Sequence, residues 1–167
     1  MSRPPRAPAS TAVQDHYPDS FAWCYGCGRL NSAGLHLTTR WDGEVTVTEY
    51  LPRPEHLAMP GYVYGGLLAS LIDCHSTGSA SLALHRRDGH ALGDGAPVPR
   101  CVTASLTLDF VRPTPQGRLL TVRGRIADVG RSRVVVRSDL EVDGDVCVTG
   151  EAVAVVAPPA MTGGGPG

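Results

Sequence analysis

The sequence contains no lysine, and its fifteen strongly basic side chains are all arginines. The formal net charge is -1, so overall charge gives no reason to expect nucleic-acid binding or attachment to an anionic membrane. No segment approaches the roughly 18 consecutive apolar residues of a membrane-spanning helix, and the first residues lack the apolar run of a secretory signal. We therefore expect a cytoplasmic protein whose five cysteines are mostly reduced thiols.

The chain of 167 residues, 42% of them hydrophobic and 19% charged, is long enough for one domain with a sizeable core. Residues 1–18 are rich in proline, alanine and serine, and residues 158–167 are mainly glycine, proline and alanine. Such segments bury little apolar surface, and we expect both to be disordered. The predicted domain therefore spans residues 19–157.

Alternating hydrophobic and polar residues predict six strands. Segments 34–41 and 44–52 flank the dipeptide Asp42-Gly43, which is typical of a hairpin turn. A helix is predicted to begin near Gly65, and a polar loop covers residues 86–100. Four further alternating segments follow, at 101–113, 118–130, 132–144 and 145–157. The order β-β-α-β-β-β-β predicts an α+β fold, in which a largely antiparallel six-stranded sheet wraps around one long helix.

The predicted helix is hydrophobic on nearly every side, which is typical of a buried helix. Asp73 lies in its middle, although burial of an ionised carboxylate without partners costs several kcal/mol. A structural interpretation is that Asp73 is half exposed or hydrogen-bonded to neighbouring hydroxyl groups. Gly78 is unfavourable in a helix by roughly 1 kcal/mol relative to alanine, so we expect close packing at that position.

Two glycines, Gly65 and Gly66, stand at the start of this helix. Free N–H groups at a helix start favour negative charge, and they would stabilise a developing oxyanion. Gly65 and Asp73 are eight residues apart, which is about 12 Å along a helix. Both residues can act on one carbon only if they come from different subunits, so a catalytic helix predicts a dimer with active sites at its interface.

The segment Tyr64-Gly65-Gly66, six residues, then Asp73 resembles the helix-entry motif of hot-dog acyl-CoA thioesterases of the phenylacetate-degradation type, related to 4-hydroxybenzoyl-CoA thioesterase. That motif reads roughly His-Gly-Gly, six residues, Asp. The predicted element order and the turn after the strand at 101–113 also agree, so the resemblance covers about residues 34–157. It implies a hot-dog fold and the hydrolysis of an acyl-CoA type thioester, with no metal or other cofactor. It also implies a homodimer, or two dimers paired into a homotetramer.

The resemblance also implies roles for individual residues. The Gly65 N–H would polarise the thioester carbonyl, and Asp73 of the partner subunit would act as general base or nucleophile. Thr103 would assist the carboxylate or the water. The residues implied in substrate binding are Gly66, Val129, Gly130, Arg131 and Ser132. Arg112, Arg131 and Arg133 are candidates for the phosphates of coenzyme A, since guanidinium groups bind phosphates through charge-assisted hydrogen bonds.

Two positions depart from the family pattern. Tyr64 stands in place of the usual histidine, and its phenol could donate a hydrogen bond instead of the imidazole. Ala58 stands where some relatives carry asparagine. His75 could titrate near neutral pH, but residues two apart in a helix point about 200° apart, so we favour a structural or dimer-interface role for it.

The motif Cys24-x-x-Cys27 has three interpretations. We favour a tight, glycine-containing turn leading into the first strand. A zinc site would need two more ligands, which only His36, Cys74 or His75 could supply through long-range folding. A redox dithiol is the third interpretation, although the expected strand and helix around it are missing. A Cys74–His75 nucleophile pair is disfavoured, because adjacent helical side chains diverge.

No G-x-S-x-G motif is present, so the sequence does not support an α/β-hydrolase route to thioester cleavage. Two alternatives to hydrolysis remain open. The protein could bind an acyl thioester or a related small ligand without turning it over, which Tyr64 and Ala58 favour. It could also be a hydratase or dehydratase of the same fold, although the Asp/His pair of that branch is not visible.

Overall fold

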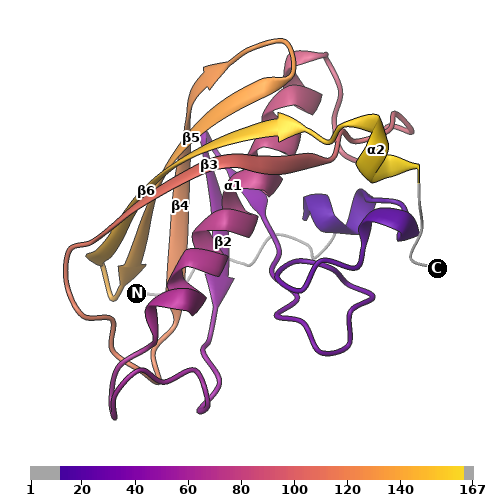
Figure 1. Cartoon of the computed structure of the whole chain (residues 1–167). Coiled ribbons are helices and arrows are strands. Elements are labelled where there is room, and N and C mark those ends of the chain that lie inside the picture. The colour runs from indigo at the N-terminus through magenta and orange to yellow at the C-terminus, as the bar shows by residue number, and fades with distance from the viewer. Residues whose placement is uncertain (1–11, 164–167) are drawn as a thin grey trace, which may run out of the picture.

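A six-stranded antiparallel sheet and one long helix form the body of the molecule. The computed structural model describes residues 12–163. The strands are β1 (Arg40–Asp42), β2 (Val45–Tyr50), β3 (Cys101–Phe110), β4 (Leu120–Val129), β5 (Arg133–Val142) and β6 (Asp145–Val156). Their spatial order is β1-β2-β4-β5-β6-β3, and helix α1 (Gly65–Arg87) lies across one face of the curved sheet (Figure 1). The predicted α+β class and element order are confirmed.

Helix α1 fills the concave side of the sheet. Leu67, Leu71 and Ile72 are almost completely buried, and small residues in the second half allow the strands to approach closely. The helix needs glycine at position 78, since a Cβ atom there would lie 2.8 Å from the Thr39 Oγ1 atom. Among residues 12–163, no helix combines the length and apolarity that crossing a membrane requires.

The first predicted strand is much shorter than expected. Only Arg40–Asp42 pair with β2, and Asp42 pairs with Val45, so the hairpin turn is formed by Gly43 and Glu44 rather than by Asp42-Gly43. Residues 34–39 form no strand, because their backbone is engaged elsewhere. The Leu35 and Leu37 amides donate hydrogen bonds to carbonyls of the preceding loop, Tyr25 and Gly26, at 2.8 and 2.9 Å.

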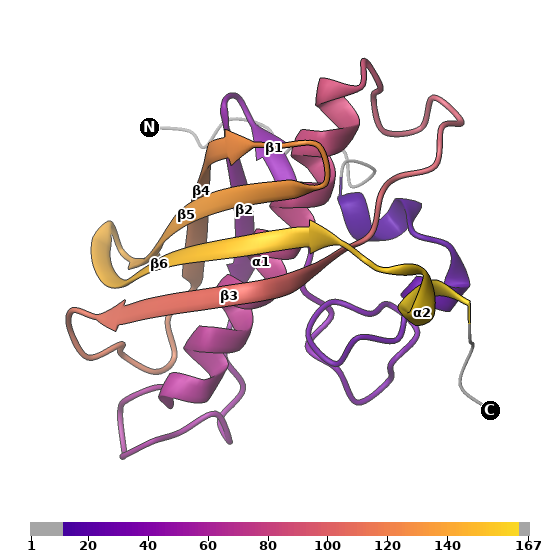
Figure 2. The same ribbon diagram turned by 45° about the horizontal axis from the view of Figure 1, so that its top comes forward.

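The prediction of disorder through residue 18 is wrong for residues 12–18. Val13–His16 form a 3-10 helix, and Val13 and Tyr17 are buried against Leu82 and Val98. A second correction concerns the C-terminal tail, where Pro159–Thr162 form the short helix α2. Both segments lie together beyond one end of β3 and β6 (Figure 2). Residues 1–11 and 164–167, also predicted to be disordered, lie outside the described residues.

Candidate active site

Asp73 and Thr103 are joined by a side-chain hydrogen bond. Asp73 lies in the middle of α1 and is half-buried, and Thr103 lies near the start of β3. The Thr103 hydroxyl donates to the Asp73 Oδ1 atom. This contact fixes one carboxylate oxygen and leaves the second without a partner among the described residues. The structure thus brings together two of the residues predicted to form a catalytic site.

A β-bulge in β3 makes this contact possible. The pairing of β3 with β6 shifts between Thr103 and Ser105, so Ala104 is the extra residue. Cys101 and Thr103 face the helix before the bulge, whereas Leu106 packs on the core after it. Because side chains alternate strictly along a regular strand, one inserted residue is needed to bring both sets to the same face.

The start of α1 offers a second polar feature. The Gly65 and Gly66 amides have no hydrogen-bond acceptor among the described residues, as expected at a helix start. A Cβ atom on Gly65 would lie 3.4 Å from the ring of Phe110, a neighbour that no local sequence pattern indicates. Gly65 and Asp73 belong to one continuous helix, so about 12 Å separates them along its axis and a single chain does not bring them together.

Tyr64 caps the start of the helix without a side-chain hydrogen bond to it. Its ring covers Gly66 and lies 6.3 Å from the ring of His56, centroid to centroid. The side chain is 40% exposed, and its phenol has no hydrogen-bond partner among the described residues. The phenol is therefore available to a ligand that approaches the helix start.

His75 points into the core, away from Asp73, as predicted for a structural residue. Its Nδ1 atom lies 2.9 Å from the Thr48 hydroxyl, and its Nε2 atom lies 3.2 Å from the Thr46 hydroxyl. Complete burial lowers the pKa of His75 to about 3, because a charged imidazole would lose its hydration. His75 is therefore neutral at physiological pH and takes no part in the candidate site.

The segment 129–132 lies at the other end of the helix. The Arg87 guanidinium donates to the carbonyl oxygens of Gly130 and Arg131, the latter at 3.1 Å. Val129 lines a cavity of about 490 Å³ together with Arg125. Thr103 and Val129 lie in the same row of the sheet, three strands apart, which corresponds to about 14 Å. Within one chain, these predicted substrate-binding residues are therefore remote from Asp73.

The predicted phosphate-binding arginines differ in their partners. Arg112 pairs with Asp145 at 3.6 Å, and Arg133 pairs with Asp128 at 3.5 Å. Arg131 and Ser132 are exposed. Within residues 12–163, Arg131 has no carboxylate in ion-pairing distance, so of the three its guanidinium is the one that is free for an anionic ligand.

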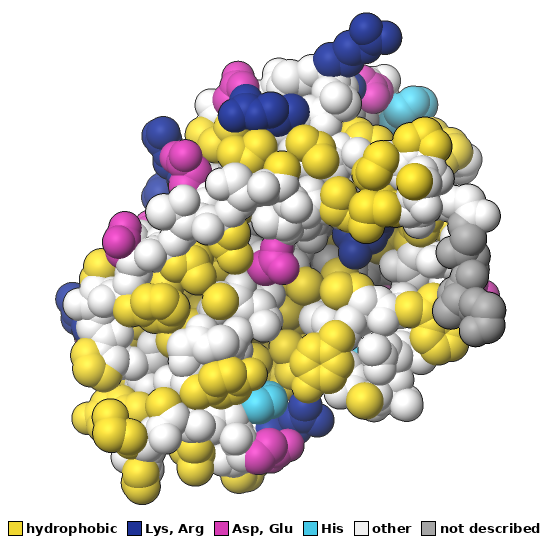
Figure 3. All heavy atoms as spheres, in the orientation of Figure 1, with side chains coloured by type: hydrophobic (Ala, Val, Ile, Leu, Met, Phe, Trp, Pro, Cys, Tyr) yellow, Lys and Arg dark blue, Asp and Glu magenta, His cyan; other side chains and the backbone are white. Residues whose placement is uncertain are grey.

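The face that carries the start of α1 and the edge strand β3 is poor in charge. Its charged side chains lie mostly towards the periphery, although an acidic and a basic side chain lie near the middle among hydrophobic and uncharged groups (Figure 3). Tyr62, Phe110 and Val111 are large exposed hydrophobic residues near these elements. On its outer side β3 has no neighbouring strand among the described residues. The edge strand β3 is ten residues long, and exposed hydrophobic residues lie near it, so it is suited to pairing with a strand of another chain.

The model of the thioesterase superfamily matches residues 60–149, which include the whole of α1, β3, β4 and β5. The chain belongs to the thioesterase superfamily. A thioesterase superfamily protein from Shewanella loihica is 45% identical, with a TM-score of 0.61 over 73% of this chain and 91% of that chain. A phenylacetic acid degradation-related protein from Ralstonia eutropha is 28% identical, with a TM-score of 0.59 over 73% and 86% of the two chains. No curated protein matches the chain.

A third structure shows the same fold with a ligand. It is a thioesterase-type protein from Streptococcus pneumoniae, solved with coenzyme A, that is 18% identical with a TM-score of 0.57 over 71% of this chain and 85% of that chain. The predicted hot-dog fold and the predicted thioesterase family, in its phenylacetate-degradation branch, are confirmed. The protein is thus a thioester hydrolase by family. The half-buried Asp73 and the open amides at the start of α1 are its candidate catalytic groups.

Proposed function

We propose that this thioesterase hydrolyses an acyl-CoA thioester to the free acid and coenzyme A. The observation that carries the proposal is the Asp73 carboxylate, held by Thr103 with its second oxygen free. A carboxylate in such a position can take a proton from water or attack a carbonyl carbon directly. The coenzyme A bound by the Streptococcus pneumoniae protein of the same fold supports this ligand class.

The proposed active site is shared by two subunits. Strand β3 has a free edge, and antiparallel pairing with a second copy about a twofold axis near Leu106 and Thr107 would set Thr103 opposite Phe110 of the partner subunit. Because Asp73 contacts Thr103 and Gly65 lies beside the ring of Phe110, this arrangement would place each Asp73 near Gly65 of the partner subunit. An isologous dimer of this kind has two identical sites, and two such dimers could pair as a tetramer.

In this site the Gly65 N–H of one subunit donates to the thioester carbonyl oxygen and stabilises the negative charge that develops there. Asp73 of the other subunit removes a proton from water as the water oxygen forms a bond to the carbonyl carbon. The tetrahedral intermediate then expels the sulfur, which takes up the proton as the C–S bond breaks. In the nucleophilic variant, an Asp73 oxygen bonds to the carbonyl carbon, and coenzyme A leaves as the thiolate when the C–S bond breaks. Water then hydrolyses the resulting mixed anhydride to the acid and the Asp73 carboxylate, and the proton released is taken up by the thiolate.

Arg131 is proposed to bind a phosphate of coenzyme A. Its guanidinium has no carboxylate partner within residues 12–163, and Arg87 positions the backbone next to it. The variant Arg131→Ala is expected to raise KM for an acyl-CoA but not for the matching acyl-N-acetylcysteamine thioester, which lacks phosphates. Arg133→Ala, whose arginine pairs with Asp128, is the control.

We propose the cytoplasm as the compartment of the protein. None of the five cysteines is in a disulfide bond, in agreement with a reducing environment.

A second candidate function is binding of an acyl thioester without hydrolysis. Tyr64 and Ala58 favour it, since they replace the histidine and asparagine of the family motif. Ala58 is exposed, and its backbone is tied into a turn by a hydrogen bond to the Tyr62 carbonyl at 3.0 Å. Its methyl group can neither donate nor accept a hydrogen bond, so any polar contribution at the helix start must come from Tyr64 or the glycine amides.

One experiment separates the two functions. A panel of acyl-CoA thioesters is incubated with the wild type and with Asp73→Asn, and thiol release is measured. The proposal predicts turnover by the wild type and a loss of at least about a hundredfold in kcat for the variant. Full activity of Asp73→Asn on the best substrate contradicts the proposed role of Asp73. A thermal shift with coenzyme A esters but no thiol release from the wild type supports binding alone.

A further inference from the structure

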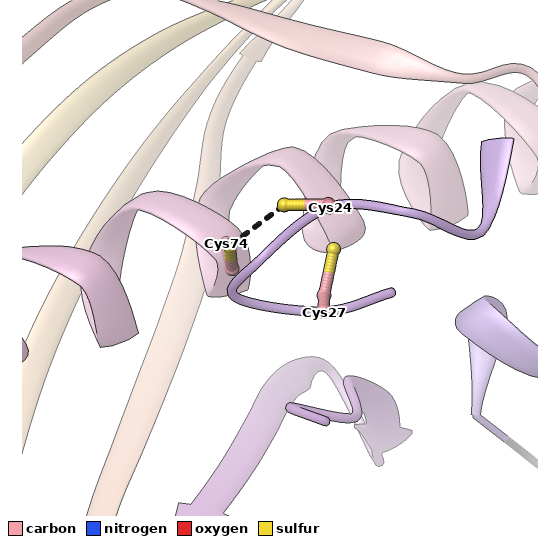
Figure 4. A group of neighbouring side chains, drawn as sticks. All are labelled: Cys24, Cys27 and Cys74. Atoms are coloured by element: carbon pink, nitrogen blue, oxygen red, sulfur yellow. Dashed lines mark hydrogen bonds between the residues drawn. The ribbon is translucent and has the colours of Figure 1, made fainter. Parts of the chain in front are cut away.

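Three cysteine side chains that the proposed hydrolysis does not use converge on one point. Cys24 and Cys27 belong to the loop before β1, and Cys74 belongs to the middle of α1, fifty residues away in the sequence. Their three sulfur atoms all lie within 4.8 Å of one another. Figure 4 shows the three side chains pointing into the space between the loop and the helix.

The distances between the sulfur atoms suit a metal ion better than a disulfide. The Cys24 and Cys74 sulfurs are 3.9 Å apart, whereas a disulfide bond is about 2.05 Å long. In a tetrahedral zinc site with Zn–S bonds of about 2.3 Å, two sulfur ligands lie roughly 3.8 Å apart. All five cysteines of the chain are free, and these three form the one His/Cys/Asp/Glu group with metal-ligand geometry that residues 12–163 contain.

The loop is built to approach the helix at this point. A side chain on Gly26 would overlap the Cys74 sulfur, and a side chain on Gly28 would overlap the backbone of Cys24. The Gly28 amide closes the turn by donating to the Cys24 carbonyl at 2.7 Å. The predicted turn therefore also brings the thiols of Cys24 and Cys27 close to the thiol of Cys74.

Arg100 supplies a charge that fits a metal–thiolate group. Its Nη2 atom lies 3.7 Å from the Cys27 sulfur, and its guanidinium stacks over the ring of Tyr17 at 4.9 Å. Within residues 12–163 this partly buried cation has no carboxylate partner. Three thiolates and one divalent cation carry a net charge of -1, which Arg100 neutralises. Partly buried charges of this kind are generally compensated by a neighbouring opposite charge.

A fourth ligand can reach the cluster from solvent. Cys24 is only half-buried, and together with Arg100, Trp23 and Val102 it lines a cavity of about 160 Å³. A water molecule occupies about 30 Å³, so this space has room for one or more waters. Three protein ligands and one water complete the four-coordinate geometry that zinc adopts.

We propose that Cys24, Cys27 and Cys74 bind a zinc ion, with water as fourth ligand and Arg100 balancing the charge. The ion would fasten the N-terminal loop to the turn of α1 that carries Asp73. This proposal does not depend on the proposed hydrolysis. It replaces the sequence-based expectation of a protein without metal, and it identifies Cys74 as the ligand that only long-range folding supplies.

The test is the metal content of the full-length chain. The protein is produced with zinc in the medium, purified under reducing conditions, dialysed, and analysed by plasma mass spectrometry. We expect about one zinc ion per chain in the wild type and in the control Cys147→Ser, whose cysteine is buried outside the cluster. Zinc content is expected to fall at least about tenfold in Cys24→Ser, with an unchanged circular dichroism spectrum.

Two further measurements keep the proposal testable if a variant fails to fold. In the wild type, a mercurial thiol reagent should release the zinc, and cobalt(II) should give a thiolate-to-cobalt charge-transfer band that Cys24→Ser and Cys27→Ser lack. Metal bound equally by the wild type and Cys24→Ser would overturn the proposal. So would a metal-free wild type without the cobalt band, or one isolated with a Cys24–Cys74 disulfide, which would instead indicate a redox pair.

Discussion

The Thr103 hydroxyl donates a hydrogen bond to the Asp73 carboxylate across the interface between β3 and α1. This contact orients a half-buried acidic side chain in the middle of a mostly buried helix. Hydrogen bonds to charged groups contribute about 1.5–3 kcal/mol, so the pair is sensitive to single substitutions.

Thr103→Val should therefore reduce kcat/KM by roughly tenfold, because valine keeps the shape of threonine but cannot donate to Asp73. Thr103→Ser keeps the hydroxyl and should retain most of the activity. Thr121→Val is a matched control, since Thr121 is partly exposed on β4, away from the proposed dimer edge at β3. Steady-state kinetics with the best acyl-CoA substrate measure the effect. Equal values for Thr103→Val and Thr121→Val would show that Thr103 does not support the carboxylate.

Tyr64→Phe tests whether the phenol replaces the histidine of the family motif. If the hydroxyl helps to bind the thioester carbonyl, its loss should lower kcat by roughly tenfold. Tyr62→Phe provides the comparison, because Tyr62 is also exposed, at 44% against 40% for Tyr64. An unchanged kcat for Tyr64→Phe would leave carbonyl polarisation to the backbone amides alone.

The buried His75 side chain should make the free energy of unfolding depend on pH. Burial lowers its pKa to about 3, whereas an unfolded histidine titrates near 6.5. Below about pH 6.5 the unfolded chain therefore binds a proton that the native chain does not. The free energy of unfolding should be highest above this pH and fall by up to about 1.4 kcal/mol per pH unit towards pH 3.

Urea unfolding at a series of pH values measures this slope. The variant His75→Gln should flatten it, because glutamine can keep hydrogen bonds to Thr46 and Thr48 but does not titrate. His56, whose pKa burial also lowers, remains in both proteins and serves as an internal reference. Identical slopes for the two proteins would contradict a neutral, buried His75.

Local sequence patterns were sufficient for most of the fold. Alternation predicted the strands, and the apolar helix beginning at Gly65 matched α1. The pattern of residues 34–39 was misleading, because alternation cannot reveal that their amides bond to the preceding loop. Likewise, the composition of residues 1–18 indicates disorder, but Val13 and Tyr17 are buried. Their burial depends on contacts with residues far along the chain.

The candidate site was predictable only where the motif was local. The spacing of Gly65 and Asp73 follows from the sequence, and helix geometry predicts two subunits if both residues act on one carbon. The bulge at Ala104, which directs Thr103 towards Asp73, has no sequence signature. The cysteine cluster could not be derived from Cys24 and Cys27, because its third member comes from the helix.

Subunit complementation tests the shared active site most directly. Gly65→Pro removes the proposed N–H donor, and proline is tolerated at the first position of a helix. Tyr64 already has the extended conformation that a residue before proline prefers, with ψ of 145°. Gly65→Ala keeps the amide and serves as the control. Alone, Gly65→Pro and Asp73→Asn should each have almost no activity.

When the two inactive variants are unfolded, mixed in equal amounts and refolded, half of the dimers contain one chain of each kind. Each mixed dimer has one complete site out of two, so thiol release should recover to roughly a quarter of the wild-type rate. Recovery near this value is the result that the shared site predicts. If the mixture stays as inactive as its two components while refolded wild type regains its rate, Asp73 and Gly65 do not act together across the dimer interface.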